Sequence, residues 1–379
     1  MQTDEIVLLE ESNSNEVTST RREFLARASV LSLVIPGVGA ALSACSPGDP
    51  GKPDTVAAAG SVARDGLTQV HNSDSKLDSS LLKGRQHGTT SATGSVASDA
   101  AFERFDPALP ALSPAGLKLD WHAREASIRI SDDTVVAAWT FQGSMPGPVV
   151  HCRVGDTVEF TLTNDVDVPH SMDFHAAQIN PKIAFRSVPK GQSVTFKFTP
   201  KWAGAFMYHC GTSPVLMHIG SGMHGAIIVS PRDPLPPAKE FVLVQSEFYL
   251  AAAANGVQAF DYQKMLTTML PDFVAFNGRP NQYIKDPLRV KVGDRVRFWV
   301  VNSGPNHPCN FHVVGEQFDT VYLGAPPGSP IRGVQTWDVP PGGGMCFELV
   351  CDTPGEFPFV NHGFGHAQHG GIGFLVVES

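Results

Sequence analysis

Short apolar runs separated by turn residues fill the chain from Gly116 onward. Within these runs β-branched and aromatic residues alternate with polar ones, which is typical of β-strands. Seven runs in roughly 115 residues predict a first Greek-key β-sandwich. The predicted strands are Ser127–Ile130, Val135–Phe141, Val149–Arg153, Thr157–Thr163, Val194–Phe198, Phe206–His209 and Ala226–Val229.

A second stretch of the chain repeats the first. Four pairs of segments align: 154–164 with 292–302, 174–175 with 311–312, 188–189 with 339–340, and 206–210 with 359–363. The first pair has no gaps and shares the pattern Val-Gly-Asp-x-Val-x-Phe with a final Asn. The sequence therefore predicts an all-β protein with two tandem Greek-key β-sandwich domains.

Changes in composition divide the chain into five parts. Small and polar residues dominate the stretch before the first sandwich, so that stretch cannot bury enough surface to order itself. A Pro-rich segment follows the first sandwich. The predicted parts are a signal at 1–44, a flexible tether at 45–114, a first domain at 115–232, a linker at 233–270 and a second domain at 271–379.

The N-terminus carries a predicted export signal. Thr20–Leu25 matches a twin-arginine signal, and an apolar run follows it. Leu42–Cys45 resembles a bacterial lipobox, in which Cys45 would be acylated after cleavage; a plain small-residue cleavage site is the alternative. We therefore expect an exported protein, periplasmic or on the cell surface, held to the membrane only through an N-terminal lipid.

The chemistry gathers around Tyr208-His209-Cys210, read together with residues 169–175 upstream. Successive side chains of an extended segment point to opposite faces, so His209 and Cys210 should look in opposite directions. By the same rule Asp173 and His175 share a face and His170 takes the other. Two groups result: His170 with Cys210, and Asp173 with His175 and His209.

The first group gains His218 and Met223 from the loop after Cys210. Two imidazoles, a thiolate and a weak thioether are the ligands of a type 1 electron-transfer copper. A single His or Met is more often structural, and an isolated Cys is usually a small buried hydrophobe. The joint spacing is far more specific than any one of these residues, so we predict a copper site.

The second group offers two imidazoles and a free carboxylate, which is a catalytic copper site that lacks one ligand. In the second domain Gly363 replaces the thiolate, so that domain keeps no type 1 copper. It does keep His312 and His362, at the places equivalent to His175 and His209. If equivalent faces pack together, His362 completes a three-histidine site with an open position, and His312 lies over it.

The remaining cysteines and the net charge limit the possible disulfides and the possible partners. Cys152, Cys309, Cys346 and Cys351 are predicted to be buried free thiols, and the odd spacing of the last two argues against their pairing. The formal net charge of -9 argues against nucleic acid as a partner. A small anionic substrate is compatible with that charge, because a bound cupric ion would dominate the local field.

Together these motifs resemble the copper-containing nitrite reductases, homotrimeric enzymes with two cupredoxin domains. The resemblance covers residues 116–379. It implies two coppers per chain: type 1 held by His170, Cys210, His218 and Met223, and type 2 held by His175 and His209 of one subunit and His362 of its neighbour. It also implies that Asp173 and His312 handle protons while nitrite is reduced to nitric oxide and water, with electrons from a small copper or haem protein.

The sequence departs from that family at a few positions. Val314 stands where the family commonly has an isoleucine that shapes access to the copper, and His307 and Cys309 near the expected cavity are unusual.

Two other readings compete with this one. A two-domain multicopper oxidase would need repeated His-x-His pairs, and the chain has none. A non-enzymatic electron carrier or copper store would leave His175, Asp173, His312 and His362 unexplained. Copper content separates the three classes, since the carrier needs one copper per chain, the reductase two and the oxidase four.

Overall fold

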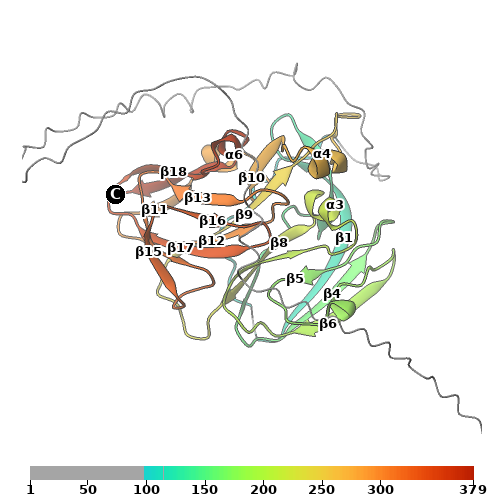
Figure 1. The fold of residues 1–379 in the computed structure, drawn as a ribbon, viewed down its shortest axis with the longest axis horizontal. Coiled ribbons are helices and arrows are strands. Elements are labelled where there is room, and N and C mark those ends of the chain that lie inside the picture. Colours follow the sequence, from blue (N-terminus) through green and yellow to red (C-terminus); the bar gives the residue numbers. More distant parts are fainter. Residues whose placement is uncertain (1–97, 114) are drawn as a thin grey trace, which may run out of the picture. The chain divides into compact units, whose positions relative to one another are not determined.

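The computed structural model describes residues 98–113 and 115–379. The predicted signal, Cys45 and the tether up to residue 97 lie outside the described residues. The described chain forms two β-sandwiches, the first drawn from cyan to green and the second from yellow to red in Figure 1. The prediction of an all-β protein with two tandem cupredoxin-like domains is confirmed.

The first sandwich packs a sheet of order β2-β1-β4-β6 against a sheet of order β3-β8-β7-β5. All seven predicted strands fall on strands of the structure, although β1 begins earlier than expected. The bounds are β1 Leu117–Arg129, β2 Val135–Phe141, β3 Val150–Arg153, β4 Val158–Asn164, β5 Asp173–Phe174, β6 Ser193–Phe198, β7 Gly204–His209 and β8 His224–Ser230.

Alternation along the strands builds the core of this sandwich. In β4 the side chains of Val158, Phe160 and Leu162 are buried, whereas the residues between them are half-buried. Trp121 of β1 packs edge-on against Phe160, with ring centroids 5.5 Å apart. Because the same alternation operates in β7, Tyr208 enters this core and the residues on either side of it face away.

The second sandwich packs a six-stranded sheet of order β10-β9-β12-β17-β14-β15 against a five-stranded sheet of order β11-β19-β18-β13-β16. The bounds are β9 Lys239–Phe248, β10 Phe273–Phe276, β11 Leu288–Lys291, β12 Arg295–Asn302, β13 Cys309–Val313, β14 Phe318–Tyr322, β15 Pro330–Val334, β16 Thr336–Val339, β17 Gly344–Val350, β18 Gly355–Asn361 and β19 Ile372–Glu378.

Two predicted boundaries need correction. The interval 233–270, predicted as a linker, contains β9, which pairs with β12 inside the second sandwich. The end of the predicted tether is also docked, because the Val242 amide donates to the Pro107 carbonyl at 2.7 Å and Arg129 donates to the Ala100 carbonyl at 2.7 Å. Backbone pairing with β9 therefore orders a segment whose composition alone favours disorder.

Helices are few and short in the described chain. No helix among the described residues has the length and apolar character that a membrane span needs. Their bounds are α2 Pro181–Ala184, α3 Val215–Gly220, α4 Tyr262–Thr267, α5 Gln282–Lys285 and α6 Phe364–Gln368.

A separate hydrophobic core joins the two sandwiches. Ala205 and Met207 of β7 pack there with Val244 of β9 and with Trp299 and Val301 of β12, all of them at most 4% exposed. This face of β7 is the opposite of the one that enters the core of the first sandwich. Successive residues of β7 thus face two different cores, and both faces of the strand are apolar for that reason.

The described cysteines are all free and buried, as the sequence predicts. Cys346 lies in the core between the sandwiches and Cys351 in the core of the second sandwich, so the pair faces opposite ways. Burial raises the pKa of the Cys152 thiol to about 12, which keeps that group protonated and unreactive.

Candidate metal centres

The end of β7 sets the geometry of both candidate sites. His209 is its last residue, and Cys210 follows directly. Asp173 of β5 pairs with His209 across the sheet. His170 lies outside any strand and forms an isolated bridge with Val188, so the expected continuous extended segment is reduced to the two residues of β5. The predicted sorting into two groups is nevertheless what the structure contains.

The first cluster joins His170, Cys210 and His218, all of them buried. The Cys210 Sγ lies 3.2 Å from the His218 Nδ1 and 3.8 Å from the His170 Nδ1. The two Nδ1 atoms are 3.1 Å apart. The Ser171 amide also points at the sulfur, at 3.3 Å.

The electrostatics of this cluster suit a soft cation. Burial, followed by the neighbouring His218, lowers the pKa of His170 to about 3, and burial lowers the pKa of His218 to about 4. Both imidazoles are therefore neutral near pH 7, with lone pairs free for a metal. Burial raises the pKa of the Cys210 thiol, although hydrogen bonds from Ser171 and Thr212 oppose the rise. A thiolate here needs a bound cation, and copper fits this donor set.

The loop that carries Met223 closes over the same cluster. The Cys210 amide donates to the Met223 carbonyl at 3.1 Å, and the Met223 amide donates to the His218 carbonyl at 3.1 Å. Met223 is fully buried in the same core as Cys210. Trp139, which we did not single out from the sequence, packs its ring 4.8 Å from that of His218. A lone Trp on a strand gives no signal by which it could have been found.

The second cluster joins Asp173, His175 and His209. The Nε2 atoms of the two histidines are 3.1 Å apart, and the Asp173 Oδ2 lies 3.7 Å from the His209 Nε2. His209 donates from Nδ1 to the Cys210 carbonyl, and His175 donates from Nδ1 to the Gly342 carbonyl, each at 2.9 Å. When both rings are neutral, the two Nε2 atoms are then both acceptors, and a shared metal ion suits such a pair.

Asp173 is half-buried beside the paired imidazoles. Burial raises the pKa of its carboxyl group, while the charges of His209 and His175 act in the opposite direction. A carboxyl group that holds its proton to higher pH than a free aspartate can act as an acid toward a ligand bound nearby.

The second domain presents His312 and His362 together, with ring centroids 5.3 Å apart. His362 follows β18 and is exposed, and its ring also packs against Phe364. His312 donates from Nδ1 to the Gln335 carbonyl at 2.5 Å, so its Nε2 is left as an acceptor. Among the described residues, no hydrogen bond or ring contact links this pair to His175 or His209.

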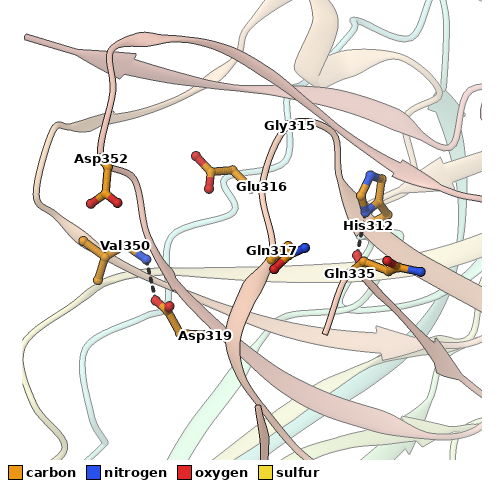
Figure 2. A pocket seen from close by; sticks show the side chains of 8 residues that line it. All are labelled: His312, Gly315, Glu316, Gln317, Asp319, Gln335, Val350 and Asp352. Carbon is orange, nitrogen blue, oxygen red and sulfur yellow. Dashed lines mark hydrogen bonds between the residues drawn. The ribbon is translucent and has the colours of Figure 1, made fainter. Parts of the chain in front are cut away.

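His312 also borders an open pocket of about 580 Å³. Figure 2 shows its imidazole at one end and the acidic side chains of Glu316, Asp319 and Asp352 at the other. Burial, then the charges of Asp352 and Asp319, raise the pKa of Glu316. Val314, the position that departs from the nitrite reductase pattern, is half-buried directly after β13.

The other described histidines have structural partners. His307 donates from Nε2 to the Met269 carbonyl at 2.6 Å and packs against His366, with ring centroids 4.9 Å apart. Neither belongs to a cluster of three metal-ligating side chains within the described residues. Cys309 is fully buried in the second core. His122 pairs with Asp165 at 2.8 Å.

Comparison with known proteins places this architecture in a class. Two multicopper oxidase family models match residues 122–234 and 239–377. The fold and these matches thus define a protein with two domains of the multicopper oxidase type. A solved multicopper oxidase is 27% identical with a TM-score of 0.61, covering 73% of this chain and 94% of that one.

Closer relatives narrow the class to one family. The copper-containing nitrite reductase of Neisseria meningitidis serogroup A is 39% identical over 282 residues, which is 72% of this chain and 72% of the relative. The solved copper nitrite reductase of Nitrosomonas europaea is 35% identical, has a TM-score of 0.64 and covers 69% of this chain and 94% of its own. The chain belongs to the copper-containing nitrite reductase family.

Replacing the sulfur ligand tests the first cluster directly. Copper-loaded wild-type protein should absorb strongly in the visible range, because a copper–thiolate bond is intensely coloured. Cys210→Ala should lose that absorption at equal protein concentration. Cys152→Ala is the matched control, since Cys152 is equally buried in the same core, and it should keep the colour. Retained absorption in Cys210→Ala would remove Cys210 from the metal site.

Proposed function

We propose that this protein reduces nitrite by one electron to nitric oxide and water. One observation carries the proposal: two different ligand clusters begin at adjacent residues, His209 and Cys210, in a chain that belongs to this family. One cluster contains sulfur and suits electron transfer. The other contains only nitrogen and oxygen donors and suits an anionic substrate.

The residues that would hold copper follow from the two clusters. His170, Cys210, His218 and Met223 would hold the type 1 ion, and His175 and His209, with His362, would hold the type 2 ion. When bound, copper would supply the redox chemistry that carries an electron from the type 1 to the type 2 site, and the Lewis acidity that neutralises nitrite. The reducing electron would come from a small copper or haem protein.

Protons are the contribution of the chain itself. Breaking one N–O bond of nitrite and releasing water takes two protons and one electron. Asp173 can give a proton at the open side of the His175–His209 pair, because its carboxyl group lies beside them and burial favours its protonated form. His312 is the second candidate, since its Nε2 has no partner among the described residues and is free to exchange protons with solvent.

The assembly proposed from the resemblance is a homotrimer. The Asp173, His175 and His209 cluster has a solvent-exposed imidazole, and so does the His312 and His362 pair. Each is an incomplete site with unused acceptor nitrogens. Contact between the first domain of one subunit and the second domain of the next would complete both at once, because a heterologous interface that closes into a ring repeats the same pairing three times.

Nitrite turnover under anaerobic conditions tests the activity. With a reduced dye as donor, the copper-loaded protein should release nitric oxide and contain two coppers per chain. One copper per chain without nitric oxide would favour an electron carrier. Four coppers with oxygen consumption would favour an oxidase.

Asp173→Asn tests the proton donor. Turnover should fall roughly 10²-fold or more, the usual scale of general acid catalysis, while visible colour and copper content stay unchanged. Asp167→Asn serves as the control, since that aspartate is exposed and paired only with Lys190. Equal turnover in the two variants would exclude Asp173 from proton transfer.

Complementation tests whether the type 2 site is shared between subunits. His362→Ala and His175→Ala should each lose type 2 copper when expressed alone. Co-expression should restore about a quarter of the sites, because half of the interfaces receive an intact His175 and half of those an intact His362. A site built within one chain would show no restoration when type 2 copper is counted by electron paramagnetic resonance.

A further inference from the structure

The turn between β16 and β17, residues Pro340–Gly343, reaches from the second domain to a candidate copper ligand of the first. The Gly342 carbonyl accepts the hydrogen bond from the His175 Nδ1 at 2.9 Å. A Cβ atom on Gly342 would lie 3.4 Å from the His175 Cε1. The imidazole therefore rests directly on this turn of its own chain.

Three consecutive glycines make that approach possible. Gly342 has φ +78°, a conformation that side chains other than glycine disfavour. A Cβ on Gly343 would come within 2.9 Å of the Pro340 ring. A Cβ on Gly344 would overlap the Ala205 carbonyl oxygen of β7. Gly342 and Gly343 thus permit the conformation of the turn itself, and Gly344 permits its close approach to the first domain.

Hydrogen bonds hold the turn in one conformation. The Gly342 amide donates to the Asn302 carbonyl at 2.8 Å, the Gly343 amide to the Pro340 carbonyl at 2.8 Å, and the Asn302 amide to the Gly343 carbonyl at 3.0 Å. The Asn302 side chain is fully buried and donates to the Val339 carbonyl at 2.9 Å. The Gly342 carbonyl is therefore fixed in direction before His175 meets it.

The first domain contains the same turn without the contact. The Gly191 amide donates to the Asn164 carbonyl at 2.7 Å, and the Gln192 amide donates to the Pro189 carbonyl at 3.1 Å. Gly191 has φ +72°, close to the value at Gly342. A Cβ on Gly191 would meet nothing within 4 Å. The chain thus offers two equivalent glycines, of which one faces His175 and the other faces open space.

We propose that Gly342 is a positioning residue for the type 2 copper site, an inference that rests on the proposed function. Its carbonyl fixes the proton of His175 on Nδ1 and turns Nε2 toward the Nε2 of His209. A carbonyl that holds the outer nitrogen of a ligating histidine sets both its tautomer and its ring orientation. The second domain of the same subunit would therefore preorganise a ligand of the first.

The test compares Gly342→Val with Gly191→Val. Both variants place a β-branched residue at positive φ and carry the same backbone strain. Only the valine at residue 342 would press on the His175 ring. Gly342→Val should bind type 2 copper about 10- to 100-fold more weakly, with an altered type 2 resonance signal, while its type 1 absorption persists. Gly191→Val should match wild type in both signals.

Equal type 2 retention and equal resonance spectra in the two valine variants would overturn the proposal. If Gly342→Val also lost its type 1 absorption, the fold would be in question, and Gly342→Ala against Gly191→Ala would decide. The alanine at residue 342 should still weaken type 2 copper, because relief of the strain at positive φ would turn the Gly342 carbonyl away from His175. No difference between the alanine pair would again overturn the proposal. A wild-type protein without type 2 copper would instead reject the proposed function.

Discussion

The opposite orientation of adjacent side chains at the end of β7 is the constraint on which the site depends. Cys210 enters the apolar core of the first sandwich, where burial makes an uncompensated thiolate costly. His209 turns toward the partly open cluster with Asp173 and His175. A single peptide bond thus separates a buried apolar environment from one that solvent reaches. Tyr208, the residue before His209, is packed in the aromatic core of the first sandwich and so holds this peptide bond in place.

The sequence was sufficient to predict what depends on local periodicity. The two ligand groups, the repeated sandwich and the free thiols all follow from alternation and spacing, as at Cys346 and Cys351. What it could not predict depends on contacts between distant segments. The docking of β9 in the second sandwich, the packing of Trp139 on His218 and the carbonyl of Gln335 at His312 leave no local signal.

The duplicated domains have diverged in a way that divides the work between them. The first keeps Cys210 together with His170 and His218, all three of them buried. The second has Gly363 at the equivalent position and keeps a half-buried imidazole at His312 and an exposed one at His362. The first copy thus encloses its histidine and cysteine cluster, whereas the second leaves His362 on its surface. Both keep the same turn with a left-handed glycine, because that turn closes the sandwich in each.

The docked segment before the first sandwich has a mechanical consequence. It adds a short backbone pairing to β9 at Ala108 and accepts hydrogen bonds from Arg129 of one sandwich and Arg279 of the other. A force applied from the N-terminal side would therefore be shared by both sandwiches. The connection between β8 and β9, where the chain passes from one sandwich to the other, would carry less of it. A pull on this docked segment would therefore load contacts to both sandwiches at once.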